Sequence, residues 1–269
     1  MNKFFDRFLT AAVYVFLYAP LLVMVFFSFN EGRSTSVFTG FSLRWYAELF
    51  SSSDTITALK NTLVLALLSA TIATVLGTMA AVGIDGMRNK WLNSAVMTTT
   101  NIPMMNPDIV TGVSLMLLFV FVGRLMGLAT SLSFITLLIA HVTFNLPYVI
   151  LNVMPKLRQV DRRLPEAAMD LGCTPRQAFF KVVLPSIRSG VLAAFLMAFT
   201  LSLDDFVISY YTNGSGFQTL PLMIFSMTKK TVKPDMYALS SVIFITILLL
   251  LILVNVLQAR SERDAKGAK

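Results

Sequence analysis

Long stretches without a charged side chain constrain this chain more than any other feature. Asp, Glu, Lys and Arg are absent from five windows: 8–30, 61–84, 125–155, 206–228 and 236–259. Two further apolar stretches are interrupted only by acids, 91–123 by Asp108 and 189–211 by the pair Asp204 and Asp205. An apolar helix of about 20 residues crosses the hydrocarbon core of a bilayer. The windows therefore predict membrane-spanning helices.

The pattern as a whole predicts an all-α membrane protein with six transmembrane helices. Only 13% of the residues are charged and 56% are hydrophobic, whereas soluble domains carry about 25% charged residues. The expected spans lie near 8–29, 58–84, 94–123, 132–153, 189–211 and 239–257. A buried helix of a soluble protein is the alternative for any single window. A cleavable signal peptide is the alternative for the first, but that window exceeds the ~7–15-residue apolar core of such peptides, so we expect an anchor.

The distribution of Lys and Arg predicts that both chain ends are cytoplasmic. In this orientation most of the 22 basic residues lie inside, as the positive-inside rule requires. Lys229, Lys230 and Lys233 fall on the outer side and run against the rule. The formal net charge of +8 is explained by this anchoring, so it implies no nucleic-acid partner.

Two irregular segments accompany the spans. The sequence SLRWYAELF places Trp45, Tyr46, Leu49 and Phe50 on one helical stripe, which is typical of a helix lying at the outer membrane interface. The third span contains Pro103 and Pro107, which break the helical hydrogen-bond ladder. This break is either a lining of the transport pathway or a simple helix start, with Asn106 as N-cap and Pro107 at the first helical position.

The sequence LPEAAMDLGCTPRQAFFKVVLP is the longest polar-rich interval of the second half, and it predicts a cytoplasmic helical hairpin. Pro165 suits the first position of a short helix, and Gly172 suits the left-handed residue after it. Thr174 is typical of an N-cap, and Pro175 of the start of a second helix that ends before Pro185. Such an amphipathic hairpin can dock in the groove of a partner.

The hairpin closely resembles the signature loop of bacterial ABC importer permeases, which reads EAA, three residues, G, nine residues, I, one residue, LP. The matching residues are Glu166, Ala167, Ala168, Gly172, Val182, Leu184 and Pro185, and Val182 in place of isoleucine is the one departure. The resemblance implies that these residues form coupling helices, which dock on a cytoplasmic ATPase subunit.

Further stretches are similar to the spermidine/putrescine branch of these permeases, and to the second of its two permeases. They include LYAPLLVMVFFSFN, MMNPDIVTGVSLMLLF, AHVTFNLPYV, AFTLSLDDFVIS and TLPLMIFS. The resemblance implies an importer of polyamines in the bacterial inner membrane, built with a homologous second permease, a dimer of the ATPase and an extracytoplasmic binding protein. It implies no cofactor in this chain, since ATP and Mg bind the partner ATPase. The expected domains are 1–57, a transmembrane helix plus an external segment; 58–255, the permease domain; and 256–269, a basic cytoplasmic tail.

Acidic and aromatic side chains are candidates for the polyamine pathway. Asp108, Asp204 and Asp205 lie within predicted spans, where a carboxylate is costly, and Tyr210 and Tyr211 follow within two turns. Carboxylates and aromatic faces both attract ammonium groups. Adjacent residues of one helix point about 100° apart, so at most one of Asp204 and Asp205 should line a pathway. The other should pair with a neighbour or a backbone donor.

A structural role is the alternative for these acids, for example a salt bridge with Lys229, Arg124 or the companion permease. His141 is the only histidine and Cys173 the only cysteine, so a metal site is not expected, and His141 is interpreted as a helix–helix hydrogen-bonding residue.

Two other functions remain open. An intramembrane aspartate enzyme would use Asp108 with Asp204 or Asp205, although the common hydrolase motifs are absent. The same permease scaffold can also carry another small cationic or neutral solute. No Gly-Lys dipeptide occurs, which excludes a phosphate-binding loop in this chain.

Overall fold

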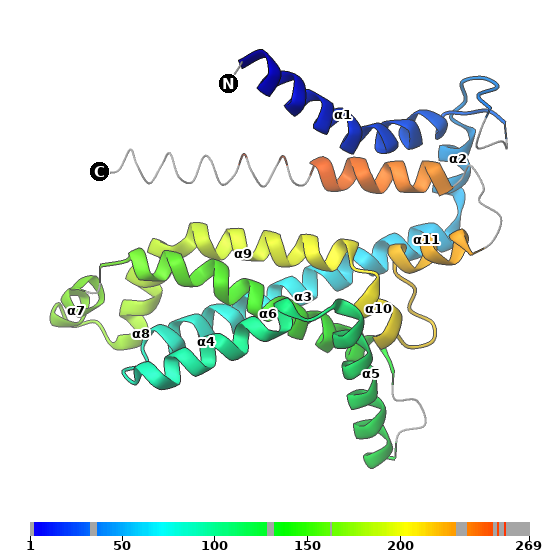
Figure 1. Cartoon of the computed structure of the whole chain (residues 1–269). Helices are drawn as coiled ribbons and strands as arrows, with labels where there is room; N and C mark the ends of the chain where they lie inside the picture. Colours follow the sequence, from blue (N-terminus) through cyan, green and yellow to red (C-terminus); the bar gives the residue numbers. More distant parts are fainter. Residues whose placement is uncertain are drawn as a thin grey trace. The chain divides into compact units, whose positions relative to one another are not determined.

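The computed structural model describes residues 3–32, 37–127, 132–161, 163–229 and 236–249, together with 252 and 256. In this part the regular structure is helical, apart from one antiparallel bridge between Asn30 and Phe41 (Figure 1). The elements are α1 (Lys3–Phe27), α2 (Arg44–Ser51), α3 (Ser53–Asp85), α4 (Lys90–Met105), α5 (Asp108–Leu125), α6 (Phe134–Gln159), α7 (Arg163–Asp170), α8 (Pro175–Ala178), the π-helix η1 (Phe179–Val183), α9 (Leu184–Asp204), α10 (Val207–Thr212) and α11 (Leu220–Thr228). The predicted all-α class is confirmed.

Five helical segments of the described chain are long and apolar enough to cross a membrane. They are Arg7–Phe27, Ser53–Asp85, Asp108–Leu125, Phe134–Gln159 and Pro175–Asp204. A shorter apolar helix over Met236–Leu249 covers the first part of the sixth predicted span. The rest of that span and the basic tail lie outside the described residues, apart from 252 and 256. The count of six and the cytoplasmic location of both ends therefore stay predictions.

The chain divides into two compact units. The first comprises Met1–Ala58 and Leu222–Leu250, and the second Leu59–Pro221 and Leu251–Lys269. The domain boundaries at 57/58 and 255/256 remain sequence predictions.

In the first unit, α2 differs from the expected interfacial helix. Trp45 and Leu49 are buried, and only Phe50 of the stripe is strongly exposed. The Trp45 indole N–H donates to the Asn30 carbonyl at 2.7 Å, and the hydroxyls of Tyr46 and Ser28 lie 2.6 Å apart. These hydrogen bonds turn the aromatic face toward the chain itself, because a buried indole N–H needs an acceptor.

The core of the second unit lies between α3, α6 and α9. Small side chains of α3 and α9 face larger ones of α6; the buried cluster is Ala70, Ala73, Ala81, Ile84, Val149, Ile150, Val153, Met154, Leu157, Ile187, Ala194 and Ala198. Alanines let helix backbones approach closely, which is the usual basis of packing in lipid, where helices gain little from hydrophobic burial. Figure 1 shows α5 leaving this bundle at a steep angle.

Two of the predicted spans are interrupted at their acidic residues. The span 94–123 is divided between α4 and α5, with Pro107 at the N-cap of α5 and Asp108 as its first residue, so the expected position of Pro107 was one residue off. The span 189–211 is not one helix: α9 ends at Asp204, Asp205 is extended with ψ 126°, and α10 begins at Val207. Asp204 and Asp205 therefore do not lie on one helix, contrary to the sequence prediction.

We expect Gly77→Ala to destabilise the second unit. A Cβ at Gly77 would lie 2.5 Å from Cγ1 and 2.8 Å from Cβ of Val149 on α6, and such overpacking costs about 1–3 kcal/mol. Gly83→Ala is the matched control on α3, because a Cβ there has nothing within 4 Å. Thermal unfolding of the detergent-solubilised protein should show a lower midpoint for Gly77→Ala only. Equal midpoints for the two variants would contradict the close packing of α3 on α6.

Candidate coupling segment and substrate pathway

The coupling segment, residues 163–185, opens with α7 and a glycine turn. The N–H of Gly172 donates to the Met169 carbonyl at 2.9 Å, and the N–H of Cys173 to the Ala168 carbonyl at 3.0 Å. This pair of bonds is a Schellman motif, which needs a left-handed residue at its centre. Gly172 has φ +91°, where a side chain is strained. The sequence prediction for Gly172 is confirmed, and α7 begins slightly earlier than predicted, at Arg163.

The second helix of the hairpin starts as predicted but does not end before Pro185. The Thr174 hydroxyl accepts from the Gln177 N–H at 3.3 Å, and the Gln177 side chain accepts from the Thr174 N–H at 2.9 Å, which is a capping box. The chain then continues from α8 through η1 into α9, so that Pro175–Asp204 forms one helical segment. Proline lacks an N–H and its ring crowds the carbonyl four residues earlier. The wide turn of η1, where the Leu184 N–H donates to Phe179, lets the helix pass Pro185.

Exposed side chains of the coupling segment are available to a partner. Glu166 and Ala167 are exposed, Ala168, Val182 and Leu184 are half-buried, and Pro185 is exposed. Leu171 is 87% exposed and Phe180 63% exposed. The sequence analysis did not single out these two. In the sequence they are two apolar residues among several in this segment, so only their exposure in the structure distinguishes them.

A polar hollow of about 1040 Å³ lies beside α7. Its walls come from the α3–α4 junction, the end of α6 and α7, and its charged members are Asp85, Arg88, Lys90, Arg158 and Glu166. The Arg158 Nε lies 4.0 Å from the Asp85 carboxylate. The coupling segment is thus joined to the ends of two core helices by a charged, water-accessible surface.

Asp205 has its partners inside the protein. One carboxylate oxygen accepts from the Ile208 N–H at 3.1 Å, and the other from the Ser209 N–H at 2.8 Å. The second oxygen also lies 3.4 Å from His141 Nε2, and the side chain is only 7% exposed. Asp205 therefore satisfies free N–H groups at the start of α10, and the basic side chain beside it is His141 rather than Lys229 or Arg124.

Asp204 and Asp108 occupy exposed helix ends. Asp204 is the last residue of α9 and Asp108 the first of α5, and both are exposed. The Asp108 carboxylate lies within electrostatic range of the Tyr148 hydroxyl of α6. Both acids are exposed, unlike Asp205.

The two predicted tyrosines have different surroundings. Tyr210 is 47% exposed, and its ring packs against Phe206 at 5.5 Å and edge-on against Tyr211 at 5.2 Å between centroids. Tyr211 is half-buried against α5, where a Cβ on Gly112 would lie 3.0 Å from the Tyr211 ring. Tyr210 is thus the more exposed of the two rings, whereas Tyr211 anchors α10 on α5.

A buried polar cluster joins α3, α6, α9 and α10. His141 Nδ1 lies 3.2 Å from the Ser202 hydroxyl, and His141 Nε2 lies 3.0 Å from the Ser209 hydroxyl. The Ser202 hydroxyl also accepts from Asn145 Nδ2 at 2.7 Å and lies 2.8 Å from the Ser69 hydroxyl. His141 is confirmed as a helix–helix hydrogen-bonding residue. Sequence spacing did not reveal its partners, because they lie on separate helices; within the described residues no group of three or more His, Cys, Asp or Glu can hold a metal ion.

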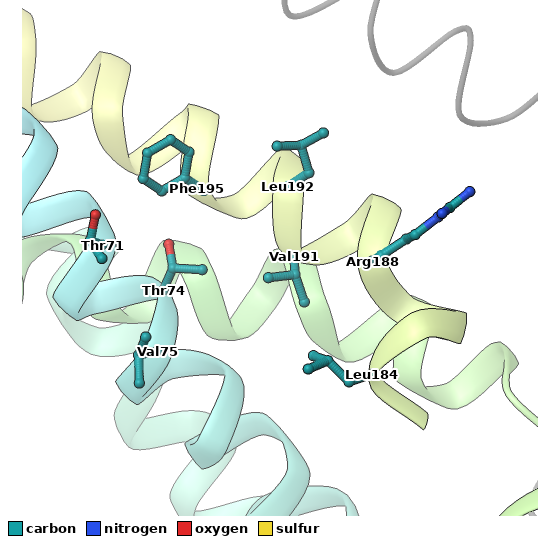
Figure 2. A pocket seen from close by; sticks show the side chains of 8 residues that line it. All are labelled: Thr71, Thr74, Val75, Leu184, Arg188, Val191, Leu192 and Phe195. Atoms are coloured by element: carbon teal, nitrogen blue, oxygen red, sulfur yellow. The ribbon is translucent and has the colours of Figure 1, made fainter. Parts of the chain in front are cut away.

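An apolar groove of about 410 Å³ runs between α3 and α9 (Figure 2). It is lined by Thr71, Thr74, Val75, Leu184, Arg188, Val191, Leu192 and Phe195. Figure 2 shows Arg188 extending away from α3 at one end of the groove. The lining residues include no carboxylate, so the groove offers no counter-charge to the ammonium groups of a polyamine.

Comparison with known proteins gives the family. The family described as "Binding-protein-dependent transport system inner membrane component" matches residues 73–267. The putrescine transport system permease protein PotI of Escherichia coli (strain K12) is 38% identical over 251 residues, covering 93% of this chain and 89% of PotI. The spermidine/putrescine transport system permease protein PotC of Haemophilus influenzae is 37% identical over 263 residues, covering 97% of this chain and all of PotC (100%).

A solved structure gives the same fold. A bacterial ABC transporter involved in the import of the acidic polysaccharide alginate contains a chain that superposes with a TM-score of 0.74 at 15% identity, covering 96% of this chain and 95% of that one. The family consists of transport components, so the chain is a multi-pass membrane transport subunit and not an intramembrane enzyme. The chain belongs to the family of binding-protein-dependent transport system inner membrane components, the permeases of ABC importers.

Proposed function

We propose that this chain is one permease subunit of an ATP-driven polyamine importer. It forms half of a pathway together with a homologous second permease, and an extracytoplasmic binding protein delivers spermidine or putrescine to it. A dimer of a cytoplasmic ATPase binds ATP and Mg and supplies the energy. The names of the relatives PotI and PotC, which are putrescine and spermidine/putrescine permeases, support the substrate class.

The observation that carries the substrate assignment is the exposed acid at the end of α9. Asp204 is exposed, whereas Asp205 is occupied by two backbone amides and His141. A carboxylate in a membrane-spanning segment costs about 2.5–3.5 kcal/mol on insertion scales, so an open one is retained for a function. Asp108, at the start of α5, and the exposed ring of Tyr210 offer further attraction for ammonium groups.

The coupling segment supports the docking of an ATPase. Its Glu166, Leu171 and Phe180 are exposed on a rigid hairpin, and the helical segment Pro175–Asp204 leads directly from this hairpin to Asp204. Closure of the ATPases would push on the hairpin, and one continuous helix would carry that displacement to the pathway.

A second candidate is an importer permease for another small cationic or neutral solute. The same exposed acids would also accept a single ammonium group, so geometry alone does not select a polyamine. Competition for uptake of labelled spermidine by unlabelled putrescine, monoamines and cationic amino acids separates the two candidates. Inhibition by polyamines alone supports the proposal, and equal inhibition by monoamines supports the alternative.

We expect Asp204→Asn to reduce the maximal rate of labelled spermidine uptake about tenfold, which corresponds to about 1.4 kcal/mol of lost attraction. We expect the maximal uptake rate to fall and the half-saturating spermidine concentration to stay the same, because the binding protein sets that concentration. Uptake is measured in cells that carry the full complex and lack other polyamine importers. Glu48→Gln removes an exposed acid of α2 and should leave uptake unchanged. Uptake by Asp204→Asn at the rate of the parent chain would refute the pathway role of Asp204.

We expect Glu166→Lys to release the ATPase from the permease. The lysine would stand on the exposed face of α7. In the proposed complex Glu166 contacts a cationic group of the ATPase, and a lysine would repel that group. Co-purification from mild detergent should give permease with little ATPase. Glu48→Lys makes the same charge reversal on α2 and should purify with a normal amount of ATPase. A complex of normal composition from Glu166→Lys would show that α7 is not the docking helix.

A further inference from the structure

We infer that His141 is a positioning residue for transport: it holds Asp205 and α10 so that the helix stops at Asp204 and presents that carboxylate to the substrate. The positioning clamp consists of His141, Ser202, Asp205 and Ser209. The inference rests on the proposed function, in which Asp204 meets the cationic substrate. It assigns a role to a fully buried histidine that touches no substrate.

The clamp connects both sides of the helix break. Ser202 lies on α9 before the break, and Ser209 lies on α10 after it. His141 reaches both hydroxyls from α6, with Nδ1 at 3.2 Å from Ser202 and Nε2 at 3.0 Å from Ser209. Because one imidazole ring joins the two helices from opposite edges, their relative orientation is fixed by the position of the ring.

The same nitrogen, His141 Nε2, lies 3.4 Å from Asp205 Oδ2. Asp205 in turn accepts the N–H groups of Ile208 and Ser209, at 3.1 and 2.8 Å. The carboxylate thus keeps α10 wound from its first turn, and His141 keeps the carboxylate in place. Without the imidazole, Asp205 would lose its contact with a polar side chain of α6.

The ring itself is held firmly. His141, Ser202 and Ser209 are 0–2% exposed, and the Ser202 hydroxyl is further fixed by Asn145 on α6 and Ser69 on α3. A cluster with members on four helices has little freedom, since removing one member leaves the others unsatisfied. A helix–helix glue would require only one such contact. The placement of all these groups at the break between Asp204 and α10 indicates a role in that break.

The clamp gives the two neighbouring acids different roles in the proposed pathway. The clamp takes Asp205 out of reach of a cation and leaves Asp204 as the terminal, exposed residue of α9. If the clamp opened, α9 and α10 could join into one helix, and the two carboxylates would point about 100° apart. The position of Asp204, and with it the uptake rate, therefore depends on His141.

A double-mutant cycle tests this inference in the assembled transporter. We expect His141→Leu to reduce spermidine uptake about as much as Asp204→Asn, and the double variant to show no further loss, because both changes remove the same positioned carboxylate. His141→Gln retains a donor and an acceptor on a side chain of similar reach, so it should restore most of the uptake. Thr143→Ala, which removes an exposed hydroxyl bonded only to its own helix, is the control on α6.

Cysteine labelling reports the clamp directly. Thr212 on α10 is fully buried, so a Thr212→Cys reporter should react slowly with a small thiol reagent. His141→Leu should accelerate that reaction about tenfold, because it removes the hydrogen bond between His141 and Ser209 that holds α10 to α6. Thr78→Cys, at a buried position on α3, should stay protected. Cys173 is the one native cysteine, so labelling of the parent chain gives the background.

The outcomes separate the clamp from the proposed function. If the uptake defects of His141→Leu and Asp204→Asn multiply in the double variant, or if labelling at Thr212→Cys is unchanged by His141→Leu, the clamp inference is wrong. A defect of Asp204→Asn would still support the pathway role of Asp204 in that case. Normal uptake by Asp204→Asn would reject the pathway, yet labelling would still report the clamp. Labelling of both reporters would mean general loosening and would reject a positioning role. If His141→Leu does not assemble with its partners, Ser209→Ala removes one clamp contact and undergoes the same tests.

Discussion

A polar group without a partner costs several kcal/mol in lipid, and this constraint acts at the two described breaks within predicted spans, α4–α5 and α9–α10. At the α9–α10 break, the Asp205 carboxylate accepts hydrogen bonds from two backbone N–H groups of the next helix and contacts His141. At the α4–α5 break, Pro107 at the N-cap has no N–H to satisfy. At these two breaks an acid or a proline thus takes part in the departure from helical geometry. The exposed acids, Asp204 and Asp108, are direct products of these two breaks.

The two functional regions are joined by one element. The helical segment Pro175–Asp204 begins in the coupling segment and ends at the acid proposed for the pathway. Its continuity depends on η1, whose wider turn accommodates Pro185. Its middle packs through Ala194 and Ala198 against α6, and α6 carries His141. In the proposed mechanism, a push on the hairpin would act on one continuous helical segment whose far end contacts the clamp.

Much of the fold was predictable because its causes are local in sequence. Charge-free windows located the helices, and proline and glycine located the turn at Gly172 and the start of α8. The failures have a common cause. Pro185 was expected to end a helix, Trp45 to face the interface, and Asp204 and Asp205 to share a helix. In each case a hydrogen bond or wider turn that the local pattern does not display decided otherwise.

The sequence by itself determined that this is a helical membrane transport subunit with an EAA coupling segment, because hydropathy and fixed motif spacing are properties of the chain read in order. It also identified the three acids of the predicted spans, Asp108, Asp204 and Asp205, as candidates for a cationic substrate. Only the tertiary structure decided between Asp204 and Asp205. The groups that occupy Asp205, His141 on α6 and the N–H groups of α10, come into contact only when the helices pack. Hydrogen bonding acts over about 3 Å, so which acid stays open depends on neighbours that are distant in sequence.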